Sequence, residues 1–180
     1  MNTKKLVVLS LLAGMGAVLH IVMPPIFQGM KPDMMLTMMF LGIILFPEIK
    51  SVGLLAIVTG ILSGLTTTFP GGLIPNLIDK PVTALLFFGL FLALKKFQTS
   101  IVSAGVLTAV GTLISGAAFL TSAYFIVGLP SAFVGLFAAV VLPAAAFNSV
   151  AMVVIYPIAQ SIVKRTKLGS QTLLQNKKVS

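Results

Sequence analysis

Long apolar stretches, broken by short segments rich in proline, glycine or charge, run through most of this 180-residue chain. Each stretch is about 20 residues long, the length that an α-helix needs to cross the hydrocarbon core of a bilayer. The breaks lie where proline or charge would end such a helix. We therefore predict an all-α integral membrane protein with six transmembrane helices.

The proline and charge positions set the bounds of the predicted helices. In chain order, the helices are expected at residues 4–23, 32–47, 50–66, 75–95, 101 to the mid-120s, and the late 130s to 165. Residues 130–165 are too many for one perpendicular span, so a short apolar outer segment is expected before the sixth helix, with Pro143 as a candidate kink. Residues 1–165 then form a single transmembrane domain, and residues 166–180 form a polar cytoplasmic tail.

Composition and charge support this interpretation. Apolar residues make up 58% of the chain and charged residues 8%, whereas about a quarter of a soluble domain is charged. With six spans both termini lie on one side, together with ten of the twelve lysines and arginines; only Lys31 and Lys80 lie opposite. This bias places both termini in the cytoplasm. The net charge of +9 then orients helices and does not predict a nucleic-acid partner.

The stretch TTTFPGGLIPNLIDKP, residues 66–81, gathers hydroxyls, an amide, a carboxylate and an ammonium between two apolar runs. Asn76, Asp79, Lys80 and Thr83 are spaced i, i+3, i+4 and i+7, so they share one face of a helix. Such a polar face cannot contact lipid, and irregular backbone at membrane depth needs protein or a water-filled cavity around it. We interpret this stretch as the outer rim of a small-molecule pocket.

Helical rise from the cytoplasmic anchors gives each polar group an approximate depth. Five groups lie about 22 to 25 Å above those anchors: His20, Asp33, Thr66, Asp79 and Asn148. This height is the outer half of a core about 30 Å thick, which predicts a cavity that is open outward and closed below. His20, a lone histidine at a helix end, is interpreted as an interfacial residue.

The candidate substrate-binding residues are the polar and aromatic side chains near this depth. They are Asp79, Asn76, Lys80, Thr83, Thr67, Phe69, Asp33, Lys31, Asn148 and Tyr124. With one histidine, no cysteine, three acidic residues and no phosphate-binding loop, the sequence predicts no catalytic, cofactor or metal site.

Structural alternatives remain open for most of these residues. Asp33 could serve as a helix cap, and Asp79 could simply pair with Lys80. The hydroxyls of residues 66–68 could bond back to their own helix, and Asn148 could bond a neighbouring helix. The aromatic rings could belong to an interfacial belt.

Two stretches carry a family resemblance: GMKPDMMLTMMFLGIILFP, residues 29–47, and TTTFPGGLIPNLIDK, residues 66–80. Together they resemble the bacterial tryptophan transport protein family, whose architecture is similar to that of the S components of energy-coupling factor transporters. The resemblance implies an S-component-like bundle in the bacterial cell membrane, with tryptophan as substrate. It also implies a transmembrane coupling subunit and two ATPases as partners, with Ala13 and Ala17 matching the AxxxA coupling motif of the first helix.

The candidate set contains every group that tryptophan needs, but leaves the assignment open. Asp33 or Asp79 could pair with the ammonium, and Lys31, Lys80 or helix N–H groups could hold the carboxylate. Phe69 or Tyr124 could stack on the indole, and Asn76 or Asn148 could accept its N–H. Two other functions stay open: a stand-alone proton- or sodium-coupled amino-acid carrier with Asp33 or Asp79 titrating, and an accessory membrane subunit that transports nothing.

Overall fold

The computed structural model describes residues 2–25, 31–94 and 100–165, and these residues are helical almost throughout, with no strand among them. The elements, in chain order, are α1 (Thr3–Val22), α2 (Met34–Leu45), α3 (Ile49–Thr66), α4 (Leu73–Ala93), α5 (Ile101–Ile126), α6 (Phe133–Leu136), the π-helical turn η2 (Phe137–Val141) and α7 (Leu142–Arg165). The all-α prediction is confirmed. The expected polar tail and the expected anchors Lys95 and Lys96 lie outside the described residues.

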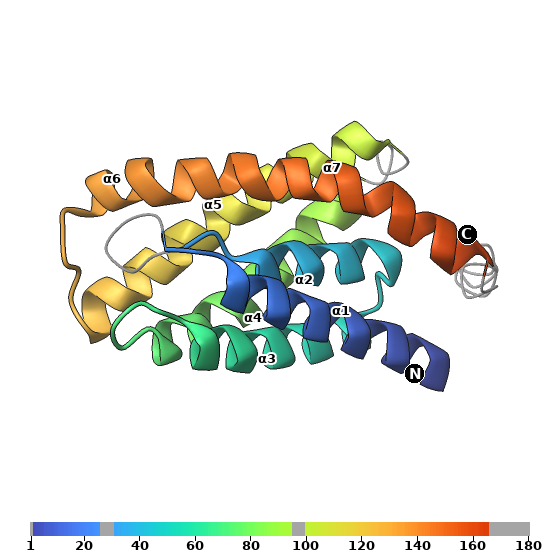
Figure 1. The fold of residues 1–180 in the computed structure, drawn as a ribbon, viewed down its shortest axis with the longest axis horizontal. Helices are drawn as coiled ribbons and strands as arrows, with labels where there is room; N and C mark the ends of the chain where they lie inside the picture. The colour runs from blue at the N-terminus through green and yellow to red at the C-terminus, as the bar shows by residue number, and fades with distance from the viewer. Residues whose placement is uncertain (1, 26–30, 95–99, 166–180) are drawn as a thin grey trace.

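The helices form one bundle, in which the start of α1 and the end of α7 lie at the same end (Figure 1). In the described part of the chain, five helical segments are long and apolar enough to cross a membrane: Thr3–Val22, Ile49–Thr66, Leu73–Ala93, Ile101–Ile126 and Phe133–Arg165. Many large apolar side chains on their outer faces are exposed, as expected of helices surrounded by lipid.

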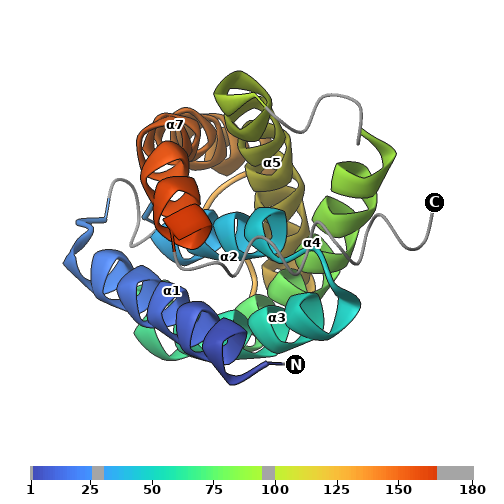
Figure 2. The same cartoon turned by 90° about the vertical axis from the view of Figure 1, so that its right-hand side faces the viewer.

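Helix α2 lies at the centre of the bundle (Figure 2), in contact with α1, α3, α4, α5 and α7. Every residue from Met34 to Ile43 is buried, because a helix that is apolar on all sides has no face to turn to water. Its 12 residues span about 18 Å, which is shorter than the predicted helix over residues 32–47. The backbone is non-helical at Asp33 and again at Phe46, where the following proline disfavours the helical conformation.

The last segment is one helical run from Phe133 to Arg165 that contains an irregularity. The short outer segment expected from the sequence corresponds to α6, which continues through η2 into α7. The π-turn ends just before Pro143, a residue that lacks an N–H and clashes with the carbonyl four residues earlier in a regular helix. The π-turn therefore lies next to Pro143, where the sequence predicted a possible kink.

A large apolar core fills the half of the bundle near the chain termini and closes it. Phe40 and Phe87 stack there with ring centroids 4.0 Å apart. Gly111 permits this, because a Cβ at that position would lie 2.6 Å from Phe40 Cζ and 2.7 Å from Phe87 Cδ2. At the same end the buried Lys5 ammonium pairs with Glu48. The polar residues singled out above lie toward the opposite end.

Candidate substrate-binding site

One cavity lies at this end of the bundle, and residues of α1, α2 and the segment between them, the α3–α4 loop, α4, α5, η2 and α7 line it. Its empty space is about 630 Å³ when the open mouth and the adjoining solvent are included. Eight of the ten candidate residues line it: Lys31, Asp33, Thr67, Phe69, Asn76, Asp79, Lys80 and Asn148. Polar groups from separate helices thus meet around one space.

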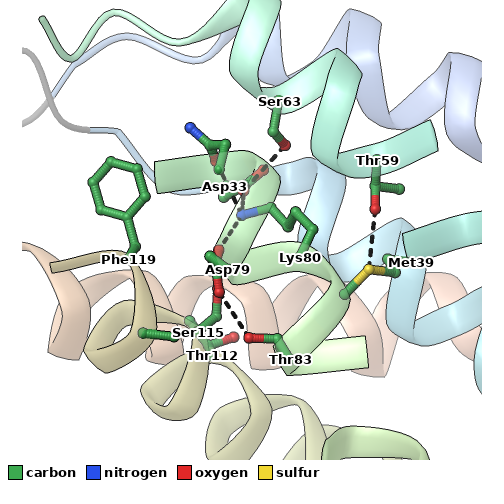
Figure 3. Close-up of polar contacts among 12 residues, drawn as sticks. Asp33, Met39, Thr59, Ser63, Asp79, Lys80, Thr83, Thr112, Ser115 and Phe119 are labelled. Carbon is green, nitrogen blue, oxygen red and sulfur yellow. Dashed lines mark hydrogen bonds and ion pairs between the residues drawn. The ribbon is translucent and has the colours of Figure 1, made fainter. Parts of the chain in front are cut away.

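Lys80 is the centre of the charged wall (Figure 3). Its Nζ lies 2.6 Å from Asp33 Oδ2, 2.5 Å from Asp79 Oδ2 and 3.2 Å from Asn76 Oδ1. A lysine ammonium has three N–H donors, so these three acceptors use all of them. The spacing along α4 produces this arrangement, since it brings Asn76, Asp79 and Lys80 to the same buried face.

Asp79 is 0% exposed and is held by groups of its own protein. Thr83 Oγ1 donates to its Oδ1 at 2.7 Å, and Ser115 Oγ donates to its Oδ2 at 2.8 Å, alongside Lys80. Thr83 is therefore a support for Asp79 and does not itself line the cavity. The Ser115 bond joins α4 to α5 at the bottom of the site.

Asp33 differs from Asp79 in the groups that surround its two oxygens. Its Oδ2 accepts from Lys80 and from Ser63 Oγ at 3.3 Å, and the side chain does not cap α2. His20 Nδ1 lies 3.1 Å from Oδ1, near enough for charge attraction when the imidazole is protonated. The two atoms are not aligned for a hydrogen bond, so Oδ1 has no hydrogen-bond donor within the described ranges.

The apolar part of the lining comes mainly from α5, η2 and α7. It comprises Phe119, Leu120, Val140, Val141 and Ala144, with Phe69 from the α3–α4 loop. Phe69 packs edge-on against Phe119 with centroids 5.5 Å apart. Gly116 lets α5 approach η2, because a Cβ there would lie 2.3 Å from Val141 Cγ1.

Asn148 lies on α7 beside this apolar wall and is 0% exposed. Its Nδ2 donates to Thr112 Oγ1 on α5 at 3.3 Å. The helix-to-helix bond that the sequence left open is thus present. The amide oxygen, however, is buried and has no hydrogen-bond partner in the part of the chain that the structure describes.

The remaining predicted residues occupy varied positions. Lys31 lines the mouth, where burial lowers the pKa of its ammonium and the Asp33 carboxylate partly offsets that effect. Thr67 Oγ1 accepts from the N–H of Phe69 at 3.2 Å and so shapes the loop. Tyr124 is 59% exposed, packs edge-on against Phe125 and is not among the lining residues.

The lining residues of α5 that were not among the candidates include Thr112, Ser115 and Phe119. They are spaced i, i+3 and i+7, so their common face was readable from the sequence, but small hydroxyls are frequent in membrane helices and gave no distinct signal. His20, interpreted as interfacial, also lines the cavity.

The predicted coupling pair on α1 is largely turned inward. Ala13 is 4% exposed, so its side chain is not on the outer surface in this conformation, and Ala17 is half-buried. The exposed small residues on this helix are Ser10 and Gly14 instead.

Comparison with known proteins agrees with the resemblance seen in the sequence. A family model described as tryptophan transporter TrpP matches residues 2–164. The chain is 57% identical over 166 residues to a probable tryptophan transport protein of Bacillus subtilis (strain 168), covering 92% of this chain and 96% of the relative. Proteins of the same name from Clostridium acetobutylicum and Clostridium perfringens are 45% and 38% identical, over 87% and 93% of this chain and 91% and 97% of the relatives. No solved structure matches the chain.

Proposed function

The chain belongs to the tryptophan transporter TrpP family, and on this premise we propose that it binds tryptophan in the cavity between α2, α4, α5 and α7 and mediates its uptake across the bacterial cell membrane. One observation supports the proposal: the lining of the cavity combines charged side chains with apolar and aromatic ones. Tryptophan has the same division, with a zwitterionic end and an indole ring.

The ammonium of the substrate is assigned to Asp33. Asp79 already accepts from Lys80, Thr83 and Ser115, whereas Asp33 Oδ1 lacks a hydrogen-bond donor. The cluster contains two carboxylates and one ammonium, that of Lys80, so it carries one net negative charge while His20 is neutral. This charge favours the binding of a cationic group of the substrate. Asp79 then acts as the anchor that positions Lys80, and Lys80 in turn positions Asp33.

The carboxylate of the substrate is assigned to Lys31 at the mouth. The three donors of Lys80 are already bonded, so this ammonium has none left for a ligand unless the cluster opens. Lys31 is half-buried at the cavity rim and is the other lysine of the lining. The indole ring then extends toward Phe119 and Phe69, whose edge-on arrangement suits aromatic contacts.

We further propose the membrane arrangement: six spans with α2 as the short central one, both termini cytoplasmic and the cavity opening outward. Lys4, Lys5, Lys50, Lys164 and Arg165 all stand at the closed end of the bundle, in agreement with the positive-inside rule. The proposed role is that of a substrate-binding subunit, without enzymatic activity, that works with a transmembrane coupling subunit and two ATPases. Tryptophan uptake by proteoliposomes that contain this chain alone would instead support a proton- or sodium-coupled carrier.

The binding proposal is tested by titrating L-tryptophan into the purified protein in detergent or nanodiscs. Tryptophan should bind, and Asp33→Asn should weaken binding by about 10- to 100-fold because a charge-assisted hydrogen bond is lost. Tyr124→Leu is the matched control and should bind as the unaltered protein does. Absence of tryptophan binding, or full affinity in Asp33→Asn, would refute the proposed site.

A further inference from the structure

We infer that Asn148 is the specificity-determining residue for the ring N–H of the substrate, which it accepts at Oδ1. The inference rests on the proposed function and deepens it, because it states which aromatic amino acids the cavity selects. Asn148 lies one turn after Ala144 on α7, beside the apolar wall that receives the ring.

The neighbouring hydroxyl fixes the orientation of the amide. Thr112 Oγ1 donates its only proton to the Thr108 carbonyl, 2.8 Å away. Toward Asn148 the Thr112 oxygen can therefore act only as an acceptor, so the group facing it at 3.3 Å is the Nδ2 donor. A flipped amide would place two acceptors against each other. The unpaired atom is consequently the carbonyl oxygen.

The second amide of the lining cannot take this role without breaking existing bonds. Asn76 Nδ2 donates to the Gly72 carbonyl at 2.8 Å, and its Oδ1 accepts from Lys80. It also lies on the same buried face of α4 as Lys80. Among the two candidates for the indole N–H, the bonding pattern selects Asn148.

A buried carbonyl oxygen without a donor is unfavourable, and an N–H brought by the ligand relieves that cost. A bound ring of the same shape but without an N–H would leave Asn148 Oδ1 buried and without a hydrogen-bond donor. The cavity should therefore distinguish tryptophan from a ring isostere by hydrogen bonding and not by size.

The experiment compares L-tryptophan with 3-benzothienyl-L-alanine, in which sulfur replaces the ring N–H, by calorimetric titration of the unaltered protein. Tryptophan should bind about tenfold more tightly. If tryptophan binds and the sulfur analogue binds equally well, this inference is overturned while the proposed function stands. If tryptophan does not bind at all, the proposed function itself fails and the inference with it.

A variant then locates the effect. Asn148→Leu should lose about tenfold in tryptophan affinity and leave the affinity for the sulfur analogue unchanged, so that the discrimination disappears. Ser149→Ala is the matched control, since Ser149 bonds the Gly105 carbonyl at 3.0 Å outside the cavity lining. Equal loss of both ligands in Asn148→Leu would mean that the residue acts only through packing and would contradict the inference. The comparison on the unaltered protein does not depend on how well this variant folds.

Discussion

Replacing Lys80 by methionine is the most informative perturbation of stability, because this buried ammonium neutralises two carboxylates. It lies within 2.6 Å of oxygens of Asp33 and Asp79 and is 2% exposed. Methionine keeps most of the apolar stem and removes the charge. Removal of one partner from a buried ion pair costs about 3–5 kcal/mol. The lower end is expected here, because Thr83 and Ser115 still donate to Asp79.

The assay is equilibrium unfolding of the purified protein in mixed micelles, without tryptophan. Lys80→Met should lower the free energy of unfolding by about 3 kcal/mol, roughly a hundredfold in the folding equilibrium. Adding Asp79→Asn to this variant should restore part of the loss, because one uncompensated carboxylate is then gone. Lys50→Met, at an exposed position, serves as the control. A Lys80→Met protein as stable as the unaltered one would refute the buried network.

Three further predictions concern separate parts of the bundle. Gly116→Ala should destabilise the protein by about 1–3 kcal/mol and weaken tryptophan binding, since its Cβ would lie 2.3 Å from Val141 Cγ1; an unchanged unfolding midpoint would argue against the close contact. Glu48→Gln should lower the free energy of unfolding, because the buried Lys5 ammonium loses its charged partner. Its affinity for tryptophan should be unchanged, and a lower affinity in calorimetry would contradict the separation of this ion pair from the binding site. Lys31→Met should weaken the binding of tryptophan more than the binding of tryptamine, which has no carboxylate. Equal effects on both ligands would refute the assignment of Lys31 to the substrate carboxylate.

The sequence predicted the all-α class and most of the polar residues that line the cavity, because two of its signals are strong. Helix spans follow from the length of apolar runs, and depth follows from helical rise. The spacing of Asn76, Asp79, Lys80 and Thr83 also predicted a shared buried face, which α4 presents. These features depend only on position along one helix.

Features that depend on rotation between helices could not be predicted. The depth of Tyr124 suited a binding residue, but the rotation of α5 turns it outward and turns Ser115 inward. In the same way, the sequence favoured a capping role for Asp33 and a ligand role for the face of Asp79, and it left both carboxylates open as partners of the ammonium. Only the arrangement of donors distinguishes them: both oxygens of Asp79 accept hydrogen bonds, whereas Asp33 Oδ1 has only the His20 contact among the described residues.

Recognition of both ends of tryptophan by one cavity can be measured by calorimetric titration of three ligands: L-tryptophan, tryptamine and indole-3-propionate. Tryptamine lacks the carboxylate and indole-3-propionate lacks the ammonium, while both keep the indole. Tryptophan should bind, and each analogue should bind at least about tenfold more weakly than tryptophan, since each loses one charge-assisted contact. Equal affinities for the three ligands, or no binding of tryptophan, would contradict recognition of both ends by this cavity.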